Sequence, residues 1–430
     1  PDGRRPRPAA GWPRPAFVVG RDTRWSGPML QAALAAGLTA EGADVVDVGV
    51  LPTPAVAAVA ADRGLPAAVI SASHNPYADN GVKLFAPGGR KLAATEEDRI
   101  EAQLALGSPT APSRSGDALG RVAFDAGARE WYCARVVAAI EGRRLDGLRM
   151  VLDCANGAAS STAPAIFASA GADVVEVLAA SPDGVNINAA CGSTDPSALS
   201  RAVVEHGADA GLALDGDADR VIAVDGCGDA VDGDHLLALF ATDLQHQGRL
   251  AGSTVVVTAM TNLGFRLAMA AAGVEVHETP VGDRHVLEAL DANGWSLGGE
   301  QSGHIIFRDL ATTGDGALSG LLLLDLIARS GRTLAELAPQ AMTRLPQVLR
   351  NVSAARPQEL AGADAVAQEV RALEAALADR GRVLLRPSGT EPVVRIMVEA
   401  PTYEAASEAA DRLVAAVLRA RDDLRLPWVP

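Results

Sequence analysis

Short apolar runs alternate with helix-like segments along this 430-residue chain, and this alternation constrains the fold more than any other feature. Residues 16–20, 45–50 and 67–70 are apolar runs typical of buried strands. The segments between them, 27–42 and 53–63, have the length and composition of helices. Strands that alternate with helices predict βαβ units and a parallel sheet. The sequence therefore predicts an α/β fold.

The same alternation restarts further along the chain. Strands are predicted at residues 148–153, 174–178, 211–214, 255–258, 275–278, 295–298, 384–386 and 393–399. Helices are predicted at residues 130–142, 196–206, 262–272, 317–328 and 403–421. A chain of this length can hold two to four such domains.

Composition excludes several classes of partner. The net charge of −15 argues against nucleic acid, because binding phosphates along a backbone requires a basic surplus. Apolar runs are too short to span a membrane. The four cysteines are widely separated, without a Cys-x-x-Cys pair, so they predict free thiols in a reducing cytoplasm rather than zinc ligands or disulfides.

The loop that follows the strand at 67–70 carries the first candidate site. It reads Ser-Ala-Ser-His-Asn-Pro from residue 71 and ends at Lys83. Ser73 is a candidate nucleophile, His74 is its neighbour, and Lys83 is one of only two lysines in a chain rich in arginine. Lysine can lose its proton when desolvated, whereas arginine effectively cannot, which favours an acid–base or charge-stabilising role. The alternative is a polar turn with a lysine placed by chance.

Arginines follow the first predicted strand. Arg21 and Arg24 lie where the strand 16–20 ends, the edge at which ligands bind in open α/β sheets. The alternative is an arginine–aspartate surface pair at the start of a helix.

Three carboxylates form the second candidate site. Asp215, Asp217 and Asp219 alternate with small residues, so the loop can fold tightly and bring their oxygens together. Carboxylates this close repel one another unless a divalent cation neutralises them, and oxygen ligands favour Mg²⁺ over Zn²⁺. A fragment of an EF-hand is disfavoured because Gly226 stands at loop position 12 and strands flank the loop; a solvated acidic turn is the other alternative. Arg220 stands beside this cluster as a candidate phosphate ligand.

Polar side chains mark a third site, at residues 279–304. Arg284 lies in the loop 279–285, and Glu300, Ser302 and His304 alternate like residues on one face of a strand. Such a set suits the hydroxyls or the ammonium of a sugar. A polar hairpin is the alternative.

The fourth site begins at Arg386 and reads Arg-Pro-Ser-Gly-Thr-Glu-Pro. Ser388 and Thr390 offer hydroxyls, and Gly389 frees backbone N–H groups to bind a phosphate. Arg395, on the next strand, can reach the same anion. A plain turn is the alternative.

These four motifs, with Gly-Arg-Asp-Thr-Arg at residue 20, resemble those of the α-D-phosphohexomutase family, in the family's order and over nearly the whole chain. The form Gly-Glu-Gln-Ser-Gly-His at residue 299 is closest to the branch that acts on glucosamine phosphate. The resemblance implies three consecutive α/β/α domains with mixed, mostly parallel sheets and a smaller C-terminal α+β domain, arranged around a central cleft. We place these domains at residues 1–144, 145–250, 251–344 and 345–430.

The resemblance also implies a mechanism. Ser73 would carry a phosphoryl group and transfer it to glucosamine 6-phosphate, forming a 1,6-bisphosphate. The bisphosphate would return its other phosphoryl group to Ser73 and leave glucosamine 1-phosphate. One Mg²⁺ would bind to Asp215, Asp217, Asp219 and the phosphoserine oxygen. A hexose 1,6-bisphosphate or autophosphorylation would prime the enzyme, which would be a monomer or a homodimer.

One departure from the family pattern stands out. The family begins with a strand and a Gly-Thr-Asp-Gly-x-Arg-Gly loop, and no such string precedes Gly20. We expect lower activity and a less stable first domain from the chain as it stands. This departure leaves open a non-catalytic protein that binds sugar phosphates. A phosphomannomutase or phosphoglucomutase of the same fold is a further alternative.

Overall fold

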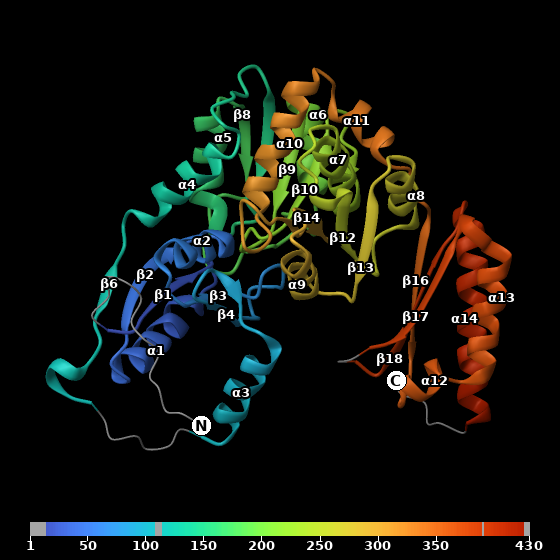
Figure 1. Ribbon diagram of the computed structural model, residues 1–430, viewed down its shortest axis with the longest axis horizontal. Helices are drawn as coiled ribbons and strands as arrows, with labels where there is room; N and C mark the ends of the chain where they lie inside the picture. The colour runs from blue at the N-terminus through green and yellow to red at the C-terminus, as the bar shows by residue number, and fades with distance from the viewer. Residues whose placement is uncertain (1–13, 108–113, 389–390, 425–430) are drawn as a thin grey trace. The chain divides into compact units, whose positions relative to one another are not determined.

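The computed structural model describes residues 14–107, 114–388 and 391–424 (Figure 1). Gly389 and Thr390 of the predicted phosphate loop, and the N-terminal residues 1–13, lie outside the described residues. Contacts divide the chain into two units: one comprises residues 1–260 and 272–341, the other residues 261–271 and 342–430.

The first sheet carries the serine loop. Its strands follow the order β5-β4-β3-β1-β2-β6. Their bounds are β1 Ala16–Arg21, β2 Asp44–Val50, β3 Ala67–Ile70, β4 Val82–Ala86, β5 Arg90–Lys91 and β6 Val122–Phe124. Strands β1, β2, β3 and β6 are parallel, and β4 and β5 are antiparallel additions. Helices α1 (Gly27–Ala40), α2 (Thr53–Arg63), α3 (Ala94–Ala105) and α4 (Ala128–Ala138) accompany this sheet in sequence.

The local sequence explains where helix α2 begins and ends. Pro54 lies in its first turn, where a missing N–H is no loss, and Gly64 ends it in a left-handed conformation with φ of 62°. The helix therefore delivers the chain directly into β3 and the serine loop.

The second sheet carries the aspartate loop. Its order is β11-β10-β9-β7-β8. The strands are β7 Arg149–Asp153, β8 Asp173–Leu178, β9 Ala210–Leu214, β10 Val221–Asp225 and β11 Ala230–Val231. Helices α5 (Ala163–Ala170), α6 (Ser197–His206) and α7 (Gly233–His246) follow the strands. Strands β9 and β10 are antiparallel and fully buried, so the loop between them rests on a rigid base.

The third sheet carries the candidate sugar loop. Its order is β13-β12-β14-β15, from β12 Thr254–Thr258, β13 Glu275–Thr279, β14 Leu297–Gly299 and β15 Ile305–Phe307. Helix α9 (Asp283–Asn293) packs on β12 and β14. Helix α10 (Gly316–Ser330) reaches back to contact β9 and β10 (Figure 1), and α11 (Leu334–Ala341) contacts α7.

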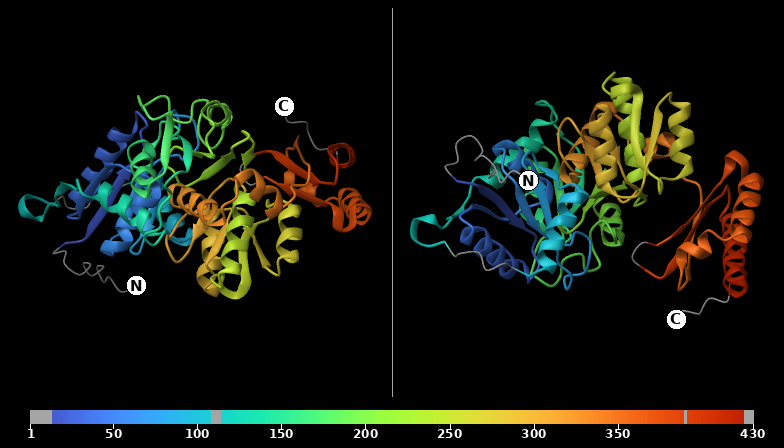
Figure 2. Two further views of the ribbon diagram at one scale, coloured as in Figure 1. Left: turned by 90° about the horizontal axis from the view of Figure 1, so that it is seen from above. Right: turned by 60° about the horizontal axis from the view of Figure 1, so that its bottom comes forward.

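The second unit has an antiparallel sheet with the order β16-β18-β17. Its strands are β16 Gln347–Ser353, β17 Arg382–Pro387 and β18 Val393–Glu399. Helices α12 (Pro357–Ala361), α13 (Asp364–Leu377) and α14 (Tyr403–Asp423) pack on the sheet, as Figure 2 shows for α13 and α14. Helix α8 (Leu263–Ala271) follows β12 in sequence but belongs to this unit.

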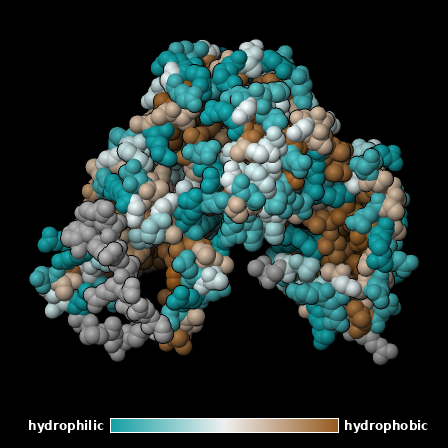
Figure 3. Space-filling model, viewed as in Figure 1, coloured by the Kyte–Doolittle hydropathy of each residue, from teal (hydrophilic) through white to brown (hydrophobic). Residues whose placement is uncertain are grey.

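The structure confirms the predicted fold class, with three mixed, mostly parallel sheets and a smaller antiparallel sheet. The helix expected at residues 130–142 is shifted: it spans Ala128–Ala138, and Glu141 has a positive φ of 53° that a helix cannot continue through. Within the described ranges, no helix is long and apolar enough to cross a membrane. The face in Figure 3 mixes hydrophilic and hydrophobic residues.

Candidate functional site

Ser73 lies in the loop that leaves β3, and its side chain points at the aspartate loop. Its hydroxyl donates a hydrogen bond of 2.5 Å to Oδ2 of Asp215, 142 residues away in sequence. Ser73 is only 8% exposed. The candidate nucleophile and the candidate metal site are therefore one site.

The three aspartates converge as their spacing predicted. One carboxylate oxygen from each of Asp215, Asp217 and Asp219 lies within 4.8 Å of the others, and all three residues are buried. Oδ1 of Asp217 and Oδ1 of Asp219 accept no hydrogen bond from the described residues. Burial and the neighbouring carboxylates raise the pKa of Asp215. Buried, mutually repelling oxygens without hydrogen-bond donors fit a hard divalent cation such as Mg²⁺.

Lys83, at the start of β4, pairs with this cluster. Its Nζ lies 2.6 Å from Oδ2 of Asp217 and 3.0 Å from Oδ2 of Asp219. Burial opposes its charge, but the two carboxylates outweigh burial and keep the pKa of Lys83 above its usual value. In this structure Lys83 is a cation, which fits an electrostatic role more directly than the role of a base.

His74 and Arg220 flank the cluster. Burial and the positive charge of Arg220 lower the pKa of His74, so its imidazole is neutral at pH 7. Nε of Arg220 lies 3.8 Å from Oδ1 of Asp219, and the carboxylates of the cluster raise the pKa of Arg220 although burial opposes its charge. Both side chains can thus act on a ligand that reaches Ser73.

Glu300, Ser302 and His304 do not lie on a strand, and that prediction is wrong. They form the turn between β14 and β15, where N–H of Gly303 donates to O of Glu300 at 3.0 Å. Gly303 has a φ of 87°, and a Cβ at this position would lie 2.0 Å from O of Val221. Glycine is therefore required at this point of the turn, because a side chain would clash with β10.

The turn still brings its polar groups to the aspartate loop. Nδ1 of His304 lies 3.7 Å from Oδ1 of Asp219, and its Nε2 lies 3.5 Å from Oδ2 of Asp283. Burial opposes the imidazolium, but these two carboxylates raise the pKa of His304. Glu300 accepts N–H of Gly282 at 3.1 Å.

Arg284 is held by an ion pair. It pairs with Glu97 of α3, while the preceding residue Asp283 pairs with Lys91 of β5. These pairs join the first and third sheets beside Lys83, and Arg284 is 26% exposed at its side chain. A ligand that used Arg284 would compete with Glu97.

Arg21 and Arg24 do not share one role. Nε of Arg21 donates to Gln31 at 3.0 Å, which ties the end of β1 to α1. Arg24 is fully buried and donates to Asp22 and to the backbone of the serine loop. Its side chain thus lies behind the loop and supports Ser73, whereas the sequence predicts it as a substrate ligand.

The predicted phosphate residues lie in the second unit. Arg386 and Arg395 are directly opposite each other on β17 and β18. Like charges at opposed positions repel, so the pair favours an anion on that face of the sheet. Arg395 also pairs with Glu391, and the buried hydroxyl of Ser388 accepts N–H of Glu391 at 3.2 Å.

Three residues at the site have no role in the sequence-based prediction. The hydroxyl of Thr53 donates to Oδ2 of Asp217. The amide of Asn188 donates to backbone carbonyls of the serine loop, and Asp283 faces His304. Thr53 lies in a Pro-Thr-Pro sequence typical of a helix start, and Asn188 lies in an Asn-Ile-Asn loop. Neither pattern predicts which distant residue the side chain contacts.

Comparison with known families covers nearly the whole chain. Four segments match the Phosphoglucomutase/phosphomannomutase family: alpha/beta/alpha domain I at residues 10–109, domain II at 130–228, domain III at 232–345 and the C-terminal domain at 349–416. A phosphoglucosamine mutase of Frankia alni is 54% identical over 409 residues, which is 95% of this chain and 89% of that protein. The chain belongs to the α-D-phosphohexomutase family.

Other phosphohexomutases agree in sequence and in fold. A phosphoglucosamine mutase of Thermobifida fusca is 52% identical over 96% of this chain and 90% of that protein. The crystal structure of a phosphoglucomutase/phosphomannomutase family protein from Burkholderia thailandensis has a TM-score of 0.79 at 26% identity, covering 96% of this chain and 91% of that one. An N-acetylphosphoglucosamine mutase from Aspergillus fumigatus, solved with GlcNAc-6P and magnesium, shares the fold with a TM-score of 0.67 at 21% identity, over 86% of this chain and 92% of that one.

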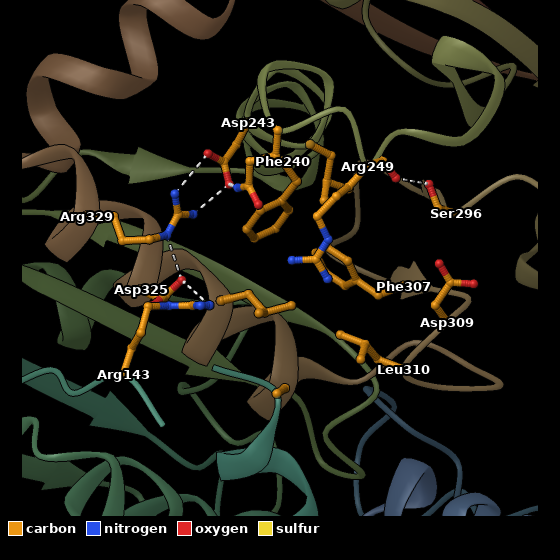
Figure 4. A pocket seen from close by; sticks show the side chains of 14 residues that line it. Arg143, Phe240, Asp243, Arg249, Ser296, Phe307, Asp309, Leu310, Asp325 and Arg329 are labelled. Atoms are coloured by element: carbon orange, nitrogen blue, oxygen red, sulfur yellow. Dashed lines mark hydrogen bonds and ion pairs between the residues drawn. The ribbon is translucent and has the colours of Figure 1, made fainter. Parts of the chain in front are cut away.

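A pocket of this phosphohexomutase lies apart from the predicted site residues (Figure 4). Its walls include Phe240 and Phe307, whose rings meet edge to face at 5.0 Å. Arg329 donates to Asp243 and Asp325, so these charges compensate one another within the pocket wall. None of the sequence-predicted site residues lines it.

Proposed function

We propose that this chain is a phosphoglucosamine mutase, an isomerase that interconverts glucosamine 6-phosphate and glucosamine 1-phosphate through a phosphoserine at Ser73. The observation that carries the proposal is the 2.5 Å hydrogen bond from the Ser73 hydroxyl to the buried aspartate cluster. Curated relatives of that name, at 52–54% identity over 93–96% of the chain, support glucosamine phosphate as the substrate.

In the proposed mechanism the phosphoryl group passes from Oγ of Ser73 to the free hydroxyl of the sugar phosphate, which loses its proton. The resulting 1,6-bisphosphate then returns its other phosphoryl group to Ser73. Phosphoryl transfer requires mainly positioning and charge neutralisation. Lys83 contributes a fixed positive charge beside the cluster, and His74 is neutral and can accept the proton of the sugar hydroxyl.

Asp215, Asp217, Asp219 and the Ser73 oxygen would hold one Mg²⁺, which would supply positive charge next to the transferred group. The buried oxygens without hydrogen-bond donors support this assignment. A hexose 1,6-bisphosphate would serve as the primer, because it can phosphorylate Ser73 without another enzyme.

Substrate recognition is divided among the remaining loops. Glu300 and Ser302 would bind the amino group and hydroxyls of the sugar, with His304 behind them. Arg220 and Arg284 would contact the reacting side of the ligand. The nonreacting phosphate would bind to Arg386, Ser388, Gly389, Thr390 and Arg395, a role that the opposed arginines of β17 and β18 support. Each of the segments 1–144, 145–250, 251–344 and 345–430 would thus supply one loop.

The test compares three substrates. Purified protein is assayed side by side with the 6-phosphates of glucosamine, glucose and mannose, with Mg²⁺ and glucose 1,6-bisphosphate present. We expect the highest kcat/KM with glucosamine 6-phosphate and a phosphate on Ser73 by peptide mapping. A preference for mannose or glucose phosphate would identify the other branch of the family, and absence of both phosphate and turnover would identify a non-catalytic binder.

A further inference from the structure

The backbone of Ser73 adopts a conformation that residues with a side chain rarely accept. Its φ is 51°, in the left-handed region. The loop around it contains no glycine before Gly81, so local sequence does not favour this geometry. Other contacts must therefore hold the serine in place.

Two donors from separate parts of the chain meet at the same pair of carbonyls. Nη2 of Arg24 donates to O of Ser73 at 2.8 Å and to O of Asn75 at 2.9 Å. Nδ2 of Asn188 donates to the same two oxygens at 2.9 and 3.1 Å. Carbonyl oxygens only accept hydrogen bonds, so they also determine which way the amide of Asn188 points.

The donor from the first sheet is itself fixed. Arg24 is fully buried, and its Nε donates to Oδ2 of Asp22 at 2.9 Å. The same oxygen accepts the hydroxyl of Ser71 at 2.7 Å, and that hydroxyl accepts N–H of Ser73 at 2.9 Å. The backbone N–H and C=O of Ser73 are therefore bonded to Ser71 and Arg24, and both of these side chains are fixed by Asp22.

The donor from the second sheet region is fixed as well. N–H of Asn188 donates to O of Ala155 at 2.9 Å, and Asn188 has a φ of 57°, which asparagine tolerates better than most residues. Gly216 of the aspartate loop packs against both partners: a Cβ there would lie 2.7 Å from O of Ser73 and 2.9 Å from Nδ2 of Asn188. Three loops thus meet at one carbonyl.

We propose that Arg24 and Asn188 are positioning residues that hold Ser73 in its left-handed conformation, so that its hydroxyl faces Asp215. Because Asn188 belongs to the second sheet region, the nucleophile is presented correctly only while that region is docked against the serine loop. We call the hydrogen bonds from Arg24 and Asn188 to the carbonyls of Ser73 and Asn75 the clamp. Its catalytic consequence rests on the proposed function, but the clamp itself is present in the protein without ligand.

The test uses Asn188→Asp and Asn188→Gly. Aspartate keeps the shape and replaces the donor with an acceptor, whereas glycine removes the side chain and still tolerates the positive φ. Asn186→Ala is the matched control, since Asn186 lies two residues away and its side chain bonds only within its own loop. Arg24→Lys is a second variant, which keeps the charge but loses the planar fork.

Two measurements are made on each protein. Hydrogen exchange of the peptide spanning residues 71–80, without ligand, reports the clamp directly. Steady-state kinetics with glucosamine 6-phosphate reports its consequence: misplacing a reacting group by about 1 Å lowers the rate on the order of a hundred-fold, so we expect kcat to fall about ten- to a hundred-fold with KM changed less than about threefold. Asn186→Ala should match the wild type in both measurements.

The outcomes separate the clamp from the function. If both Asn188 variants exchange and turn over like the wild type, the clamp does not position Ser73 and the proposal is wrong. If kcat falls as much in Asn186→Ala as in the Asn188 variants, the proposal is also wrong, since the loss would then come from disturbing the loop as a whole. If the wild type is inactive on every hexose phosphate, the proposed function fails, and faster exchange in Asn188→Asp alone still decides whether the clamp exists.

Discussion

Ser73 and Asp315 show how burial changes what a single side chain can do. Ser73 is 8% exposed, yet its hydroxyl directly contacts the aspartate cluster. Asp315 is buried at the start of α10, where it accepts N–H of Leu318 and the hydroxyl of Tyr132. Asp215 and Tyr132, which lie 142 and 183 residues away in sequence, thus set part of each role.

Replacing Ser73 with alanine removes the atom that would carry the phosphoryl group. We expect Ser73→Ala to lower mutase turnover on the order of a thousand-fold or more, because no other group can form the covalent intermediate. The melting temperature should change little, since no core volume is lost. Turnover and melting curves are measured together, with phosphopeptide mapping of the wild type; a phosphate on Ser71 would contradict the assignment.

Asp315 should make stability depend on pH. Burial raises its pKa from 3.8 to about 6 although Leu318 and Tyr132 donate to it. A carboxyl group whose pKa is higher in the folded protein binds protons more tightly when folded. Its stabilising contribution is therefore complete below about pH 4 and is lost as the pH rises to about 6.

Asp315→Asn tests this dependence because asparagine stays neutral and can still cap the helix. Between pH 4 and pH 8, the stability of the variant should rise relative to the wild type by on the order of 2–3 kcal/mol. Urea unfolding at pH 4, 5, 6 and 8 measures the difference. A difference between Asp315→Asn and the wild type that stays flat across this pH range would refute the raised pKa of Asp315.

At the scale of elements, the hairpin of β9 and β10 presents the aspartates to three neighbours. Lys83 of β4 and Thr53 of α2 contact Asp217, and His304 of the β14–β15 turn contacts Asp219. The lysine offsets part of the repulsion among the carboxylates in the metal-free protein. The cluster is therefore preorganised by elements of the first and third sheets.

Removing one charge from this hairpin should weaken metal binding. We expect Asp217→Asn to lower Mg²⁺ affinity at least about ten-fold and activity with it, because one of three anionic ligands is lost. The metal-free melting temperature should change little, since Lys83 keeps its contact with Asp219. Calorimetric Mg²⁺ titration compares it with Asp229→Asn, an exposed carboxylate in the turn between β10 and β11. Equal affinity in both variants would exclude this site.

At the scale of the whole molecule, the chain folds into two units that do not follow sequence order. Helix α8 is inserted between β12 and β13 yet packs within the second unit. Fully buried Glu399 accepts N–H of Leu263 at 2.9 Å and pairs with Arg382 at 3.1 Å. This carboxylate therefore joins α8 to β17 and β18.

Glu399→Ala should destabilise the second unit selectively. Leaving Arg382 without this partner costs on the order of 3–5 kcal/mol, as for other broken buried pairs. Hydrogen exchange should show parallel loss of protection in α8 and in β16, β17 and β18, with the first unit unchanged. The exposed Glu408→Ala serves as the control, and a loss confined to the sheet would show that α8 is held in another way.

Local patterns in the sequence predicted many of the helices and strands and the chemistry of the loops. Apolar runs predicted β1, β3 and β9, which lead into the serine and aspartate loops, because burial periodicity is a local property, but they did not predict β4, β10 or β15. The spacing of Asp215, Asp217 and Asp219 predicted their convergence for the same reason: the chain between them is too short to separate them.

Contacts between segments far apart in the sequence could not be predicted from local patterns. The burial of Arg24, the reach of Asn188 to Ser73 and the attachment of α8 to the second unit all depend on contacts across 49 to 137 residues. The turn at Glu300 to His304 matches the polar hairpin that the sequence left as the alternative to a strand, but its close approach to Val221, whose N–H donates to O of Gly303 at 3.1 Å, was not predictable from the sequence. No short window of sequence contains both partners of such a contact, so docking of the sheets alone sets these roles.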